Sequence, residues 1–233
     1  EIAPDWAFAL HNMPGLPLGR AALVAGAANC ASEGLRVVLR GKTSHASVPE
    51  RGVSPALTLA RVIPAAMALG TGGDLGPGFR LVTVCHARMG EPAFGIAPGE
   101  AELWLTLRTL VDADMSQLRA GVVALVEDAA REGGLRAEFS THDRFAACSN
   151  DPEAVAVLAR ALADCGIPVG RDGLPMRASE DFGRFGQVAK AAMVLLGAGE
   201  AHPMLHNPDY DFPDALIGPG VALFERVLRD LLG

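Results

Sequence analysis

Lysine and aromatic side chains are scarce in this sequence, and their scarcity argues against a nucleic-acid partner. Aromatic residues make up 5% of the 233 residues, which leaves few rings on which unpaired bases could stack. Lys42 and Lys190 are the only lysines, and Lys+Arg 20 against Asp+Glu 27 gives a formal net charge of -7. Binding to a phosphate backbone requires the opposite sign of charge. The composition therefore indicates a protein that does not bind nucleic acid.

Apolar runs long enough to cross a membrane are missing, and so are paired cysteines. The longest uncharged stretches, 21–32 and 62–73, fall well short of the roughly 20 apolar residues that a span needs. The opening residues EIAPDW lack the basic and apolar regions of a signal peptide. The 4 cysteines form no C-x-x-C pair, which excludes a zinc knuckle and a thioredoxin motif. We therefore expect a cytoplasmic protein with reduced thiols and no membrane contact.

The middle of the chain predicts a compact unit of strands and helices. Leu103, Leu105 and Leu107 alternate with Trp104, Thr106 and Arg108, which is the period of a strand. The order of predicted elements between residues 35 and 145 is strand, helix, strand, strand, helix, strand, as in the ferredoxin-like fold. Pro64 is expected to kink or break the first helix. The expected strands are 35–39, 79–89, 102–110 and 135–140, and the expected helices are 55–69 and 115–132.

The two flanking segments predict a second, larger domain. Half of the residues are apolar, so both domains can bury a core. The expected strands of the flanks are 6–10 and 191–196, and the expected helices begin at Asp151 and near Gly220. The sequence therefore predicts an α/β (α+β) protein in which residues 35–145 are inserted between residues 1–34 and 146–233.

A few histidines and carboxylates stand where a site could form. His11 and His206 each follow an apolar pair and precede an asparagine, near prolines. Side chains at strand ends reach the sheet edge where sites form, so metal ligation is one explanation. The alternative is two capped loop histidines. His45 lies in a polar loop and Glu180 in a Glu-Asp pair, and by themselves both are also explained as solvated surface residues.

Five segments occur in an order typical of one enzyme family. They are FALHNMPGLPLG, GKTSHASVPERGVSPA, FGIAPGEAELWLTLRT, SEDF and LHNPDYDFPD. With these segments the chain resembles the metal-dependent amidohydrolases and metallopeptidases that include aminoacylases, hippurate hydrolases, indole-acetyl-amino-acid hydrolases and carboxypeptidase G-type enzymes. The resemblance covers essentially the whole chain. It implies a zinc-peptidase-like α/β catalytic domain with the ferredoxin-like unit inserted as a lid and dimerisation domain.

The resemblance implies a site with two divalent metal ions, zinc or manganese. His11 and His206 match the family's histidine after a buried strand and its histidine near the C-terminus, which are both metal ligands. The family's Cys-x-His motif and Glu-Glu pair, which supply further ligands and the general base, have no counterpart before His11. We therefore expect the catalytic domain to be incomplete, and this chain by itself to bind metal weakly or not at all.

The resemblance also implies roles for four other residues. His45 matches a lid histidine that crosses the dimer and stabilises the oxyanion, and Arg108 matches a lid arginine that binds the substrate carboxylate. Gly95 stands where the family has a lid asparagine, so an amide donor is missing from the substrate site. Glu180 is expected beside a metal rather than bound to it.

Together these implications predict hydrolysis of the amide bond of N-acyl amino acids or small peptides by a metal-dependent homodimer. The alternative is a truncated product without catalytic activity, competent only for dimerisation through the lid.

Overall fold

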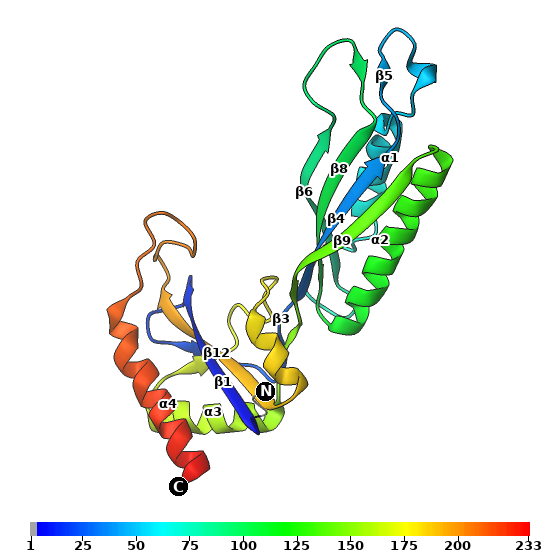
Figure 1. Ribbon diagram of the computed structural model, residues 1–233. Helices are drawn as coiled ribbons and strands as arrows, with labels where there is room; N and C mark the ends of the chain where they lie inside the picture. The colour runs from blue at the N-terminus through cyan, green and yellow to red at the C-terminus, as the bar shows by residue number, and fades with distance from the viewer. Residues whose placement is uncertain (1–3) are drawn as a thin grey trace. The chain divides into compact units, whose positions relative to one another are not determined.

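The computed structural model describes residues 4–233 and divides into two compact units. Unit 1 joins the N-terminal residues up to Cys30 to Ala146–Gly233, and unit 2 is the continuous stretch Ala31–Phe145 (Figure 1). The division falls at Cys30 rather than at the expected residue 34, because the first strand of unit 2 already begins at Ala31. Among the helices described, none is both long enough and apolar enough to cross a bilayer.

Unit 1 is built on a four-stranded sheet in the order β1-β12-β2-β11. Its central strand β12 (Lys190–Gly199) is buried over most of its length, which explains its nearly continuous apolar sequence. Strand β1 (Trp6–Pro14) lies at the edge of the sheet and runs parallel to β12. The remaining strands are β2 (Ala21–Ala22), β11 (Val169–Gly170) and a separate antiparallel pair, β3 (Gly26–Asn29) with β10 (Cys148–Asn150).

Two helices pack on one face of this sheet. Helix α3 (Pro152–Asp164) begins at Asp151, whose carboxylate accepts hydrogen bonds from the amides of Glu153 and Ala154 at 2.8 and 3.0 Å. Helix α4 (Ile217–Leu232) shares a buried cluster with α3 and β12. Two short 3₁₀ helices, η2 (Asp181–Gln187) and η3 (Asp214–Leu216), complete the unit.

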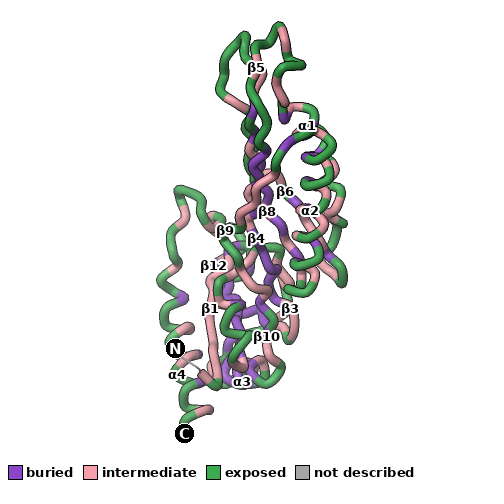
Figure 2. The backbone as a smooth tube through the Cα atoms, turned by 45° about the vertical axis from the view of Figure 1, so that its right-hand side comes forward, coloured by how far each residue is buried: buried purple, intermediate pink, exposed green. Residues whose placement is uncertain are grey.

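Unit 2 is a four-stranded antiparallel sheet in the order β6-β8-β4-β9. Both of its helices cover the same face, so β8 buries every second residue and leaves the others partly or fully exposed (Figures 1 and 2). A small pair, β5 (Ser44–His45) with β7 (Ile96–Ala97), extends beyond one end of the sheet, next to the 3₁₀ helix η1 (Pro49–Arg51). The strands are β4 (Ala31–Arg40), β6 (Arg80–Met89), β8 (Glu100–Thr109) and β9 (Arg136–Phe145), and the helices are α1 (Ala56–Met67) and α2 (Asp112–Glu132).

The expected break at Pro64 is wrong, because α1 continues through this residue to Met67. Pro64 lies in the last turn, so the helix loses a single amide donor, and the carbonyl of Pro64 still accepts from Ala68 at 3.0 Å. The expected strand at residues 6–10 is too short. Pairing with β12 continues to Pro14, which places His11 inside β1 rather than after it.

Candidate active site

His11 lies on β1 opposite Leu195, near the carboxyl ends of two parallel strands. Its Nδ1 atom is 2.6 Å from the backbone oxygen of Asn12. A carbonyl oxygen can only accept a hydrogen bond, so Nδ1 carries the proton and donates it. In the neutral ring, Nε2 then keeps its lone pair. This is the tautomer of a metal-binding histidine whose second nitrogen donates to the backbone.

Glu180 is brought to the same place from a distant part of the sequence. One of its carboxylate oxygens, Oε1, lies 3.6 Å from Nε2 of His11. The two side chains are 27% and 24% exposed, so a small solute can reach both. The carboxylate of Glu180 adds negative charge beside Nε2 of His11, which favours a cation at this position.

The donor set of the described chain is nevertheless incomplete. Within residues 4–233, no group of three or more His, Cys, Asp or Glu side chains could hold a metal ion. A catalytic zinc needs about three protein ligands. These residues fit part of a metal site, and the expected weakness of metal binding by this chain alone remains a prediction.

His206 lies on an exposed turn in the loop that follows β12. The amide of Asn207 donates to the carbonyl of Met204 at 3.1 Å, and His206 has a φ of 68°. A positive φ at the third residue of such a turn is typical of type II, where glycine or asparagine is usual. Because β1 and β12 are parallel neighbours, the loop with His206 leaves the sheet at the edge where His11 lies.

His202 and His206 are four residues apart, but this stretch is a loop and not a helix. The Nε2 atom of His202 lies 2.7 Å from the backbone oxygen of Asp211, to which it donates. His202 therefore supports the loop and does not form a chelating pair with His206.

His45 belongs to unit 2, on the small strand β5 opposite Ile96 of β7. The backbone N–H of Ser47 donates to Nδ1 of His45 at 3.1 Å, so Nδ1 is an acceptor without a proton. The proton of the neutral ring is then on Nε2. The side chain is exposed, which makes its Nε2–H available as a hydrogen-bond donor to a ligand.

Gly95 lies beside His45, and Arg108 does not. The carbonyl of Gly95 accepts from the amide of Ala46 at 2.9 Å, and Gly95 has a φ of 85°. Arg108 pairs with Ser32 and Leu81 near the opposite end of the sheet. From Glu100 to Arg108, β8 advances about 27 Å at about 3.4 Å per residue. The structure therefore separates His45 and Arg108 within unit 2.

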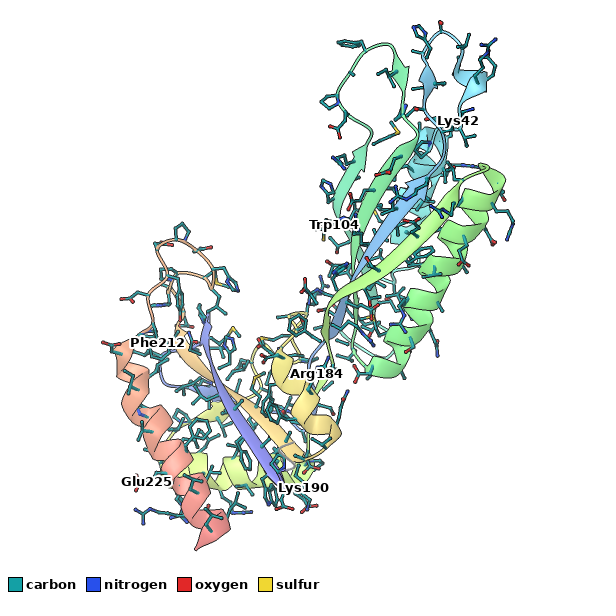
Figure 3. The ribbon with its side chains drawn as sticks, in the orientation of Figure 1. Lys42, Trp104, Arg184, Lys190, Phe212 and Glu225 are labelled. Carbon is teal, nitrogen blue, oxygen red and sulfur yellow. The ribbon has the colours of Figure 1, made fainter. Side chains whose placement is uncertain are left out.

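The exposed face of the four-stranded sheet of unit 2 carries a row of ion pairs. Trp104 is labelled in Figure 3. Nε of Arg36 and the indole N–H of Trp104 each donate to Glu102 at 2.5 Å, and together they lower the pKa of this carboxyl. The pKa of Glu138 is lowered in the same way, first by its hydrogen bond from Arg40. These shifts belong to a charged surface, and none of the expected site residues contributes to them.

Two residues near His11, Asn12 and Tyr210, could not be identified from the sequence. Asn12 donates from Nδ2 to the hydroxyl of Tyr210, which joins β1 to the loop that carries His206. The sequence contains a His-Asn dipeptide at 11–12 and another at 206–207, and this similarity indicates the two histidines as site residues but not Asn12. The only signal for Tyr210 was its uniqueness, since the chain contains one tyrosine.

The sequence of this chain matches one family model and is similar to known hydrolases. The family model described as peptidase family M20/M25/M40 matches residues 1–230. The chain is 24% identical over 226 residues to N-acetyl-L-cysteine deacetylase of Bacillus subtilis (strain 168). This alignment covers 97% of the present chain and 54% of the deacetylase. The chain is also 24% identical over 229 residues to hippurate hydrolase of Campylobacter jejuni, which covers 96% of this chain and 58% of the relative. The chain thus spans about half the length of the curated relatives it matches.

A solved structure shows the same fold. The YXEP protein of Bacillus subtilis is described as a dinuclear metal-binding peptidase from the M20 family. It matches with a TM-score of 0.79 at 18% identity, covering 98% of this chain and 57% of that chain. The mixed α/β architecture with several sheets is therefore that of an M20 peptidase-like domain.

Proposed function

The chain belongs to peptidase family M20/M25/M40, and from this membership we propose that it hydrolyses the amide bond of N-acyl amino acids or small peptides with two divalent metal ions. The named relatives act on N-acetylcysteine and hippurate, which are both N-acyl amino acids. One observation carries the proposal in this chain. The Nδ1 atom of His11 donates to the carbonyl of Asn12, and its Nε2 atom lies 3.6 Å from a carboxylate oxygen of Glu180 near the carboxyl ends of two parallel strands.

In this proposal, His11 and His206 each hold one metal ion, and Glu180 lies beside His11. Divalent ions bound there would polarise the substrate carbonyl and lower the pKa of a bound water. The backbone oxygen of Asn12 keeps the proton of His11 on Nδ1, so that Nε2 remains a ligand. Glu180 adds negative charge, which favours a cation at this position.

His45 and Arg108 act on the substrate. The Nε2–H of His45 donates to the oxygen of the scissile carbonyl, and this bond strengthens as negative charge develops on that oxygen. The guanidinium of Arg108 pairs with the substrate carboxylate. Because Gly95 has no side chain, it offers the acyl group no side-chain amide, and the exposed Phe94 beside it presents an apolar surface.

The spacing within unit 2 supports a site shared by two copies of the chain. An N-acyl amino acid spans about two residue lengths, roughly 7 Å. It cannot bridge the distance of about 27 Å along β8, so His45 and Arg108 of one copy cannot contact the same substrate molecule. We therefore propose that unit 2 is a ferredoxin-like lid and that it forms a homodimer, with His45 acting on the partner's substrate. The strand order β6-β8-β4-β9 supports the ferredoxin-like assignment.

The test compares two forms of the protein. One is expressed from its complete gene, and the other is a polypeptide of residues 1–233. The first is expected to contain metal by elemental analysis and to hydrolyse N-acetyl or N-benzoyl amino acids, with loss of activity on chelation and recovery with zinc or manganese. Hydrolysis that persists after complete metal removal would contradict the proposal. If neither form binds metal but both dimerise, the non-catalytic alternative is correct.

A further inference from the structure

Tyr210 connects the two segments that carry His11 and His206. Its hydroxyl accepts a hydrogen bond from Nδ2 of Asn12, the residue directly after His11. Tyr210 lies four residues after His206, in the loop between β12 and η3. This loop has no strand or helix from Glu200 to Pro213. The hydrogen bond attaches it to the end of β1.

Two consecutive turns transmit this anchor to His206. The amide of Tyr210 donates to the carbonyl of Asn207 at 3.0 Å, and the amide of Asn207 donates to the carbonyl of Met204 at 3.1 Å. His206 lies inside the turn that Met204 and Asn207 close, and its backbone is in the left-handed region of φ and ψ. A residue with a Cβ atom in that region costs about 1–2 kcal/mol, so the conformation persists only where its surroundings hold it.

The ring of Tyr210 is itself held from the other side. The His202 ring packs edge-on against it, with ring centroids 5.5 Å apart. Nε2 of His202 donates to the carbonyl of Asp211, the residue after Tyr210. The tyrosine is therefore fixed at its backbone, its ring and its hydroxyl, and it is half-buried.

We propose that the Asn12–Tyr210 hydrogen bond is a clasp that positions the His206 turn relative to His11, which makes both residues positioning residues for the metal site. The inference rests on the proposed function, because it takes His11 and His206 as ligands. The backbone of Asn12 fixes the tautomer of His11, and its side chain holds the loop of the second ligand. One asparagine thus serves both histidines.

The central variant is Tyr210→Phe in the protein expressed from its complete gene. It removes the hydroxyl and keeps the ring contact with His202. Zinc affinity, measured by competition with a chelator, is expected to fall about 10-fold, within the range of about 10- to 100-fold for lost ligand support. In the metal-free protein, the amides of Asn207 and Tyr210 are expected to exchange hydrogen faster, because the turns lose their anchor.

Two variants of Asn12 separate the clasp from general stability. Asn12→Leu removes the donor at similar volume and should match Tyr210→Phe in zinc affinity, and the double variant should be no worse than either single one. Asn12→Asp should retain the affinity, since the tyrosine hydroxyl can donate to the carboxylate. Ser140→Ala, which removes a hydroxyl 2.9 Å from Nε2 of His142 in unit 2, is the control and should change neither readout.

The clasp is wrong if Tyr210→Phe leaves either zinc affinity or amide exchange as in the unaltered protein. It is also wrong if Asn12→Asp loses as much affinity as Asn12→Leu. Absence of zinc binding by the unaltered protein would contradict the proposed function instead, and hydrogen exchange would still decide whether the clasp holds the loop.

Discussion

The backbone N–H of Ser47 donates to Nδ1 of His45, whereas Nδ1 of His11 donates to the carbonyl of Asn12. The two histidines therefore carry their protons on opposite nitrogens. His11 presents a lone pair at Nε2 and can bind a metal, and His45 presents an N–H at Nε2 and can bind a developing oxyanion. The neighbouring backbone groups thus give two histidines, His11 and His45, different chemical roles.

His45→Ala is expected to lower kcat of the metal-loaded enzyme about 100- to 1000-fold, because a donor to the oxyanion is lost. Metal content and KM should change little, since the bond strengthens only as charge develops. His45→Gln should retain part of the activity, because its amide can also donate. Steady-state kinetics with elemental analysis checks this, and a loss of metal in His45→Ala would show that His45 is a ligand.

His206→Ala is expected to remove one metal ion per chain and to abolish turnover, while the site at His11 keeps its metal. The matched control is His142→Ala, because His142 lies on β9 of unit 2, where its Nε2 atom is 2.9 Å from the hydroxyl of Ser140. Elemental analysis of both dialysed variants gives the result. Full metal content in His206→Ala would contradict its assignment as a ligand.

Most of unit 2 could be predicted from the sequence, because its signals are local. Leu103, Leu105 and Leu107 alternate, and β8 buries these three residues. The helix at Asp112–Glu132 follows from its apolar period, although it begins three positions before the expected Met115. The expected break at Pro64 was wrong, because a proline in the last turn of a helix disrupts it less than one in the middle.

The site was less predictable, because its geometry depends on contacts between distant segments. The sequence indicates His11 and His206 but contains no trace of the distance between His11 and Glu180. The backbone of Asn12, whose oxygen accepts from Nδ1 of His11, lies in the part of β1 beyond Leu10 that pairs with β12. The positive φ of His206 could not be predicted either, since the third residue of a type II turn is usually glycine or asparagine.

Unit 2 is expected to lose stability at acidic pH through Glu102. Arg36 and Trp104 hold the pKa of this carboxyl below its ordinary value of 4.5 in the folded state. The contribution is therefore fully present above about 4.5 and is lost as the pH falls through the lower folded-state pKa. Thermal unfolding between pH 6 and 3 measures this loss when it is followed by the fluorescence of Trp104 in a Trp6→Phe background, because Trp6 is the other tryptophan of the chain. In Glu102→Gln the slope should be smaller, and an equal slope would contradict the assignment.

Gly95→Asn is expected to fold normally and to change substrate preference. Gly95 has a φ of 85°, and a Cβ atom there meets nothing within 4 Å. Asparagine tolerates the left-handed region better than most residues, whereas Gly95→Val should destabilise unit 2 by about 1 kcal/mol or more. The added amide should raise kcat/KM for N-acetyl relative to N-benzoyl substrates. An unchanged ratio of the two would show that Gly95 does not face the acyl group.

Mixing two inactive variants tests whether His45 acts across a dimer. His45→Ala has intact ligands and no donor, and His206→Ala has an intact donor and a defective metal site. If His45 acts on the partner's substrate, a mixed dimer contains one complete site, with ligands from the first variant and the donor from the second. If it acts within its own chain, no combination restores a site.

The expected result follows from counting. Random exchange at equal concentrations makes half of the dimers mixed, each with one of two sites complete, so activity should return to about a quarter of the unaltered value. The separation of about 27 Å along β8 between the His45 end and Arg108 makes the shared site the expected arrangement. A third variant, Arg108→Ala mixed with His45→Ala, should also complement if Arg108 serves its own chain's site. Failure of both mixtures, with exchange verified by mass spectrometry, would place His45 in its own chain's site.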